Sequence, residues 1–190
     1  MKKHIALLAL TMLAANAFAG SNEKVTEKRS SKPYSFIDIR GEIDVKLVQD
    51  GQHMVSVEGS VYQVGNLATI LRNDTLFVYQ TNTRKSDKIP SVSISVENLS
   101  GLTVTGKSSV DGSGLVNADY LVIRAYEGAS IKLDVRALKV DSKATGCSFI
   151  DVSGNVASKA EQSDGCSRIS SLGLDVLEIK SDTPKLCVRC

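Results

Sequence analysis

The chain has 190 residues, of which 42% are hydrophobic and 5% aromatic, with 23 basic and 21 acidic side chains and a net charge of +2. Removal of Lys2 and Lys3 with an N-terminal signal would leave equal numbers of basic and acidic residues, which argues against nucleic acid or an anionic membrane as the main partner. The abundance of Val, Ile, Ser and Thr favours β-strands, and the length fits one domain.

The first residues are typical of a secretory signal peptide. Two lysines precede an apolar run over residues 5–15, and the small residues Ala17 and Ala19 form a cleavage site before Gly20. We therefore predict a signal peptide over residues 1–19 and export to the periplasm, the cell surface or the medium. The apolar run is too short to span a bilayer, so no membrane insertion is expected. Residues 20–33 are polar and aperiodic, which predicts a disordered leader.

Alternating apolar and polar residues follow the leader. Turn signals at Gly41, Asp50-Gly51 and Asn73-Asp74 separate the alternating segments. These segments predict strands with one buried face over residues 36–39, 43–47, 54–57, 76–79 and 92–96.

A near-repeat occupies the second half of the chain, with its glycines 22, 18 and 19 residues apart. Its four copies are Gly106-Lys107-Ser108, Gly128-Ala129-Ser130, Gly146-Cys147-Ser148 and Gly165-Cys166-Ser167. This period is typical of stacked β-coils, each of which buries its apolar face against the next. We predict an all-β fold, a single right-handed parallel β-helix (β-solenoid) over residues 34–190 that begins with irregular strands. Its open ends would need a cap or would pair in a homo-oligomer.

Two parts of the chain resemble a known family. Residues 34–49, with 76–78, resemble the opening of the putative auto-transporter adhesin head GIN domain, and residues 106–110 and 128–131 resemble its Gly-Ala-Ser coils. The resemblance covers roughly residues 34–177. It implies an exported bacterial β-helical domain at or near the cell surface, in a family of unknown function with no catalytic residue to transfer. The cysteines of the last coils depart from the family pattern.

Cys147 and Cys166 occupy the same position of adjacent predicted coils. Parallel strands lie about 4.8 Å apart, within the Cα separation that a disulfide accepts. Such a bridge would contribute on the order of 3 kcal/mol by the chain-entropy model. The alternative is that both are unbonded, inward-facing thiols in a ladder that Ala129 begins.

Cys187 and Cys190 form a C-x-x-C spacing at the end of the sequence. Redox catalysis and zinc binding are both disfavoured, because no helix follows to activate a thiol and two cysteines are too few ligands. A structural role in capping the last coil is the preferred interpretation. Four cysteines allow three full connectivities, so a pairing such as Cys166 with Cys187 stays open. We expect no metal site and no cofactor.

Asp111, Asp134 and Asp151 recur five or six residues after the repeat glycines. A column of carboxylates could bind calcium or hydrolyse a glycan. The simpler interpretation is that outward positions are polar and that lysines at 132, 143 and 159 neutralise the aspartates.

The serine column of the repeat, Ser108, Ser130, Ser148 and Ser167, does not indicate a nucleophile. The base would have to be His53, which is the one histidine after residue 19 and is expected on a surface turn. Small hydroxyls that bond local backbone explain the column better. Tyrosines at 62, 79, 120 and 126 could stack on sugar rings if they shared a face, although core or edge packing is the simpler expectation.

These observations favour a non-enzymatic, adhesin-like binding or structural module that recognises an extended glycan or an envelope protein. The alternative is a polysaccharide-cleaving β-helix enzyme, in which the surface carboxylates converge with Lys132 or Arg136 in a groove.

Overall fold

The computed structural model describes residues 24–82 and 89–176, so the predicted signal peptide and the pair Cys187 and Cys190 lie outside it. The described residues form twelve strands and one short helix. In chain order these are β1 (Lys24–Ser30), β2 (Phe36–Arg40), β3 (Asp44–Gln49), β4 (Met54–Ser60), α1 (Val61–Gly65), β5 (Leu67–Arg72), β6 (Thr75–Gln80), β7 (Ser91–Val96), β8 (Gly101–Thr105), β9 (Ser109–Tyr126), β10 (Ser130–Thr145), β11 (Phe149–Ser163) and β12 (Arg168–Val176).

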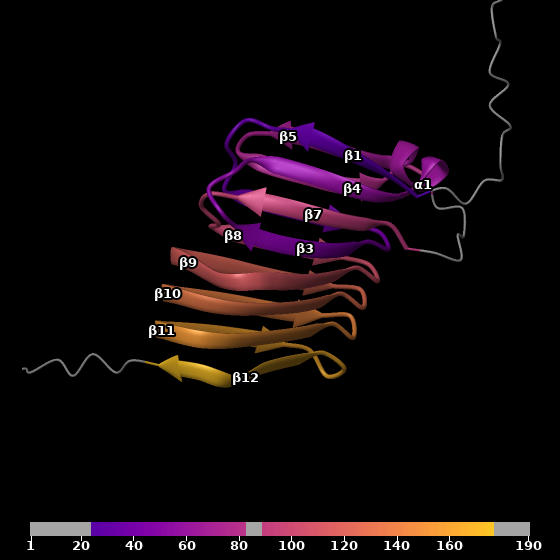
Figure 1. The fold of residues 1–190 in the computed structure, drawn as a ribbon. Helices are drawn as coiled ribbons and strands as arrows, with labels where there is room; N and C mark the ends of the chain where they lie inside the picture. The colour runs from indigo at the N-terminus through magenta and orange to yellow at the C-terminus, as the bar shows by residue number, and fades with distance from the viewer. Residues whose placement is uncertain (1–23, 83–88, 177–190) are drawn as a thin grey trace, which may run out of the picture.

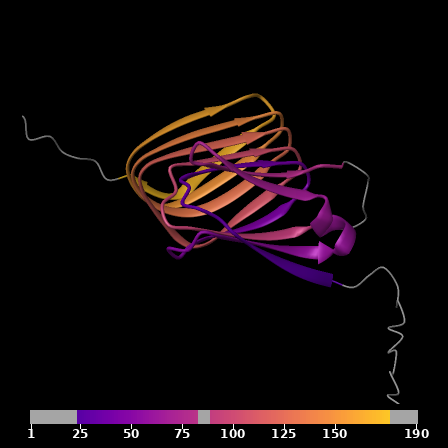
Figure 2. The same ribbon diagram turned by 90° about the horizontal axis from the view of Figure 1, so that it is seen from above.

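All twelve strands belong to one curled sheet. Its order is β1-β4-β7-β3-β9-β8-β2-β6-β5, and β10, β11 and β12 continue from the other edge of β9. Three pairs are antiparallel, namely β1 with β4, β4 with β7 and β5 with β6, and the remaining pairs are parallel. The sheet therefore forms a half-barrel of mixed strands (Figures 1 and 2).

The predicted right-handed parallel β-helix over residues 34–190 is wrong. The Gly-x-Ser repeat lies only in the turns that precede β9 to β12, and it carries no information about the earlier strands. There, a tight turn reverses the chain between β5 and β6 through Asn73 and Asp74, whose φ angles are 46° and 63°. Two successive positive φ angles suit a two-residue hairpin, which pairs its strands antiparallel.

Strand β9 bends and joins the two walls of the half-barrel. Its first part pairs with β3 and its last part pairs with β8, while β10 follows it along nearly its whole length. We call the strands β1, β4, β7, β3 and the first parts of β9 to β11, with β12, the first wall. The second wall consists of β5, β6, β2, β8 and the last parts of β9 to β11. Figure 2 shows the curl that connects them.

The core lies between the walls and is built from rows of side chains in register. On the first wall one buried row is Val92, Val45, Val110, Ile131 and Ile150. On the second wall an equivalent row is Leu76, Ile37, Leu102 and Ile123. Burial of these apolar faces is the main favourable contribution to folding.

The prediction of a disordered leader over residues 20–33 is also wrong for the range Lys24–Ser30. These residues form β1, which pairs antiparallel with β4 in seven-residue register. Arg29 anchors the strand, because its guanidinium donates hydrogen bonds to the carbonyl oxygens of Leu67 and Val64 at 2.7 and 3.1 Å. The strand could not be predicted from its sequence, because most of its side chains face solvent and no apolar alternation marks it. The stability of β1 comes from backbone pairing with β4.

Serines of the repeat tie one turn to the next, as the backbone-bonding interpretation expects. The Ser148 hydroxyl donates to the carbonyl of Thr145 at 2.8 Å and accepts from the amide of Gly128 at 3.2 Å. Ser108 is equally buried and donates to the carbonyl of Gly41 at 2.9 Å. Ser130 does not belong to this column, since it pairs with Ser109 and leaves the inward position to Ala129.

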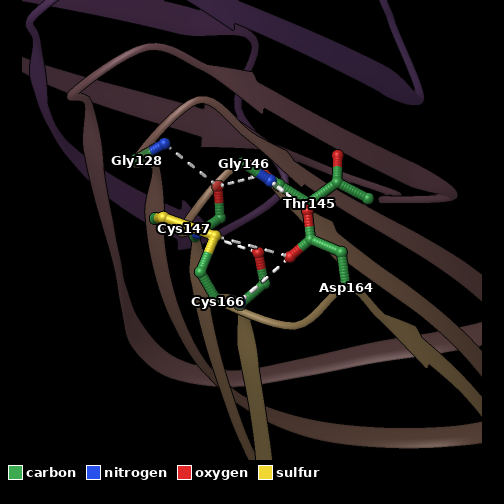
Figure 3. The surroundings of a disulfide bond; sticks show 8 residues. Gly128, Thr145, Gly146, Cys147, Asp164 and Cys166 are labelled. Atoms are coloured by element: carbon green, nitrogen blue, oxygen red, sulfur yellow. Dashed lines mark hydrogen bonds between the residues drawn. A yellow bond between two sulfur atoms is a disulfide. The ribbon is translucent and has the colours of Figure 1, made fainter.

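Cys147 and Cys166 form a disulfide between adjacent turns, with their Cα atoms 4.6 Å apart (Figure 3). Both residues are exposed, so the alternative of an inward thiol ladder is wrong. Asp164 completes the turn, since its carboxylate accepts from the amides of Gly146 and Ser167 at 2.7 and 3.0 Å. The pKa of Asp164 is lowered, chiefly by a hydrogen bond with the Ser167 side chain and next by the hydrogen bond from the Gly146 amide.

Replacing both Cys147 and Cys166 with alanine should lower the free energy of unfolding by about 3 kcal/mol, because the unfolded chain regains loop freedom. Thermal unfolding under non-reducing conditions measures the loss. Reductant should lower the melting temperature of the parent chain and leave that of the double variant unchanged. A variant as stable as the parent would contradict this contribution.

Gly154 on β11 has no room for a side chain. Its φ is 110°, and an added Cβ would lie 2.0 Å from the carbonyl oxygen of Val135 on β10. Gly154→Ala should therefore destabilise the protein by about 3 kcal/mol or more, measured by denaturant unfolding. Gly114→Ala is the matched control, because φ is also positive there but nothing lies within 4 Å, so we expect about 1–2 kcal/mol. Equal losses in the two variants would contradict the close approach.

Candidate ligand-binding face

The outer surface of the second wall carries aromatic and basic side chains in one register row. Tyr79 on β6 pairs with Arg40 on β2, which pairs with Thr105 on β8, which pairs with Tyr126 on β9. These positions alternate with buried residues, so their side chains lie on the outer surface. At about 4.8 Å per strand, the two tyrosines lie about 14 Å apart.

The neighbouring outer row adds Phe77, Asp38, Thr103 and Arg124, again one residue from each strand. We call the surface formed by these two rows the aromatic face: Phe77, Tyr79, Asp38, Arg40, Thr103, Thr105, Arg124 and Tyr126. Phe36 borders it with 41% of its surface exposed, and its ring lies over Gly101, where an added Cβ would meet ring carbons.

Arg40 lies within this face and forms an ion pair with Asp38. Its Nε and Nη2 donate to the two carboxylate oxygens of Asp38 at 2.8 and 2.7 Å, and its guanidinium carbon lies 5.9 Å from the centre of the Phe77 ring. The pKa of Arg40 is raised, first by the hydrogen bond to Asp38 and then by its charge. A bidentate pair against an aromatic ring presents a rigid planar surface.

A depression of about 360 Å³ lies beside this pair. Its lining residues are Asp38, Arg40, Gly41, Phe77, Tyr79 and Gln80. Gln80 is fixed, because its amide both donates to the carbonyl and accepts from the amide of Glu42 at 3.1 Å. The volume lies at the lower end of the range for ligand sites, about 300–1,000 Å³, and suits one ring of a larger ligand.

The other basic group of the face is held in the same manner. Arg124 Nη1 donates to the side chain and the carbonyl of Asp141 at 3.0 and 2.9 Å. The hydrogen bond from Arg124 is the main cause that lowers the pKa of Asp141. Tyr120, 43% exposed, lies on the same outer surface of β9, with the Lys139 ammonium 5.5 Å from its ring centre.

Three of the four tyrosines considered from the sequence therefore share the outer surface of the second wall, and Tyr62 does not because it lies on α1. Sequence reasoning missed Asp38, Arg40 and Phe77. Their alternation with apolar residues indicates that their side chains point outward, but no local feature of the sequence indicates that β2 and β6 are neighbours in register.

The three aspartates do not form a column. Asp111 and Asp151 share a row on β9 and β11, but Lys132 on β10 lies between them. Asp134 belongs to another row, between Leu115 and Ser153. Lys132 thus lies in register beside both Asp111 and Asp151, which is the placement that the simpler interpretation expects. That interpretation does not hold for the other two lysines, since Lys143 aligns with Arg124 and Gln162, and Lys159 pairs with Glu161 at 3.1 Å.

His53 is not the surface residue expected from the sequence, because its side chain is only 15% exposed. Its ring packs edge-on against Tyr34 at 5.5 Å, and its Nε2 lies 3.4 Å from Glu97. Tyr34 donates to the carbonyl of Ser95 at 2.7 Å, and burial, followed by the charge of Asp50, raises its pKa to about 12. This cluster packs the first wall and places no serine hydroxyl on the histidine.

Within residues 24–82 and 89–176, no group of three or more His, Cys, Asp or Glu side chains could hold a metal ion. Among the same residues, no helix has the length and apolar character to cross a membrane.

The curled sheet of mixed parallel and antiparallel strands defines an all-β domain. The chain belongs to the family described as "Putative auto-transporter adhesin, head GIN domain", whose model matches residues 33–183. This confirms the resemblance found in the sequence. No curated protein matches the chain.

Solved structures from two bacterial species have the same fold. A putative adhesin from Bacteroides fragilis is 18% identical with a TM-score of 0.77, over 81% of this chain and 73% of that one. A putative adhesin from Parabacteroides distasonis is 18% identical with a TM-score of 0.64, over 83% and 76%. A structure from the same species described as a putative lipid binding protein is 16% identical with a TM-score of 0.60, over 82% and 76%. At these identities the likeness concerns the fold.

Proposed function

We propose that this chain is a non-enzymatic, exported binding module whose aromatic face takes an extended glycan. The observation that carries the proposal is the register row in which Arg40 lies between Tyr79 and Tyr126, beside the depression lined by Phe77. Aromatic rings can stack on the apolar faces of sugars, while planar charged groups and threonine hydroxyls bond sugar hydroxyls.

The rigidity of the face supports binding. Tyr79 and Tyr126 project from paired strands, and Arg40 is held by both Asp38 and Phe77. Side chains that are already ordered lose little conformational entropy when a ligand binds. An extended polymer can contact several strands at once, whereas a small molecule would fill only the depression.

The carboxylates of the second wall, Asp38 and Asp141, argue against a polysaccharide-cleaving site at the aromatic face. A glycosidase needs one carboxyl with a raised pKa as its general acid. Asp38 and Asp141 are instead paired with Arg40 and Arg124, and the pKa of Asp141 is lowered.

Membership of an adhesin family supports a place at the cell surface or outside the cell. The other candidate ligand for the aromatic face is an envelope protein. If the chain bound such a protein and retained no glycan, we would conclude that the ligand is a protein.

Tyr79→Ala and Tyr126→Ala should each weaken retention on a glycan array of bacterial and host polysaccharides by roughly tenfold, because each removes a stacking ring. Tyr62→Ala is the matched control, since Tyr62 is a tyrosine exposed to 44% on α1, away from the face. The same array is scored for released product, and release by the parent chain would favour the enzyme. Equal retention by all three variants would contradict the aromatic face.

We also propose that the chain associates through the end of its sheet. Strand β12 pairs with β11 along one edge, and no strand among the described residues pairs with its other edge. An unpaired edge is a template for strand addition.

Light scattering of residues 20–190 over a range of concentrations should therefore show a dimer that dissociates on dilution. The variant Leu172→Lys, at an exposed position of β12, should shift the dissociation to higher concentration, since a lysine on an edge strand opposes strand addition. A monomer at every concentration would contradict the association.

A further inference from the structure

A groove of about 660 Å³ lies where β9, β10 and β11 bend from one wall to the other. Three polar side chains in register form one side: Asn117 on β9, Arg136 on β10 and Asn155 on β11. Asp119 and Leu138 also line the groove, and Leu138 is 63% exposed. Alanines at 118, 137 and 157 keep the space between open.

Several polar side chains of this groove have no partner among the described residues. Within the part of the chain that the structure describes, the side chains of Arg136, Asp119 and Asn155 make no hydrogen bond or ion pair. Arg40 and Arg124, by contrast, are both held by carboxylates. Converging free polar groups in a concave site are typical of ligand recognition.

The rim of the groove is rigid. The Gln49 side chain donates to the carbonyl oxygens of Glu97 and Asn117 at 2.8 and 3.0 Å, and it accepts from the Asn117 amide at 2.6 Å. These bonds fix the loop that carries Asn98, which also lines the groove, against β9. The groove is therefore preformed without a ligand.

We propose that this groove binds a carboxylate-bearing sugar unit of the glycan, with Arg136 as the residue that recognises the acid. A guanidinium without a partner matches a carboxylate bidentately, and the flanking amides of Asn117 and Asn155 bond the hydroxyls beside it. Asp119 accepts a hydrogen bond from a sugar hydroxyl. Acidic sugars retain such hydroxyl donors. This inference rests on the proposed glycan-binding function and specifies its ligand class.

Strand β9 connects the groove to the aromatic face. Asn117 lies in the groove, Tyr120 lies just beyond it, and Tyr126 lies at the far end of the same strand. A glycan that follows β9 can place an acidic unit on Arg136 and stack other units on the tyrosines. The charge selects the ligand class, and the rings supply contact that does not depend on charge.

The probe is an oligogalacturonate, and its methyl ester is the matched neutral ligand. The parent chain should bind the acid more tightly than the ester, and added salt should narrow the difference. Arg136→Gln should weaken binding of the acid by about tenfold or more and leave binding of the ester nearly unchanged. Asp119→Asn should tighten binding of the acid, because it removes a like charge from the groove.

Lys132→Gln is the charge-matched control, because it removes one positive charge from the same strand outside the groove. The melting temperature of each variant checks that the fold is intact. Loss of acid binding in Arg136→Gln alone supports the inference. The inference is overturned if the parent chain binds the acid and the ester with equal affinity. It is also overturned if Arg136→Gln weakens binding of both ligands equally, or if Lys132→Gln weakens binding of the acid as much as Arg136→Gln does. Retention of neutral glycans that depends on Tyr79 tests the proposed function separately, so failure of one is distinguishable from failure of the other.

Discussion

In-register parallel pairing of β9, β10 and β11 is the constraint on which the rest of the structure depends. Each inward side chain lies beside its equivalent on the next strand, so Val110, Ile131 and Ile150 form one continuous apolar row. A slip of one residue would turn every such side chain to solvent. The buried serines and the disulfide between Cys147 and Cys166 act at the turns, where they hold the strands to the same register.

The same register arranges the outer surface. Because buried and outward positions alternate, a fixed inner row also fixes an outer row, and residues distant in the sequence become neighbours. Tyr79 and Tyr126 face solvent beside Arg40 for this reason. The backbone of a paired strand is rigid, so a surface of this kind presents its groups without the loop ordering that a flexible site would require.

Electrostatics divides the second wall and the bend into two kinds of region. On the aromatic face, Arg40 and Arg124 are neutralised by Asp38 and Asp141, which favours contact through rings and hydroxyls. At the bend, Arg136 has no carboxylate partner among the described residues, which favours recognition of an anion. Because β9 runs through both regions, one extended ligand can engage them together. The overall balance of charges conceals this local difference.

The sequence by itself determined the all-β class, most strand positions of the first half and the family, because alternation and repeat spacing are local properties. It placed Cys147 and Cys166 within reach of a disulfide, but only the structure decided that these two cysteines pair. It did not determine the strand β1, whose stability comes from β4, or the antiparallel pairs that turn the predicted β-helix into a curled half-barrel. The row of Tyr79, Arg40 and Tyr126 was equally hidden. Strand neighbours and their direction follow from backbone hydrogen bonds between distant segments, and side-chain alternation is the same whichever partner a strand takes. Only the tertiary structure decided these, because the energy that selects a partner comes from burying the whole core at once.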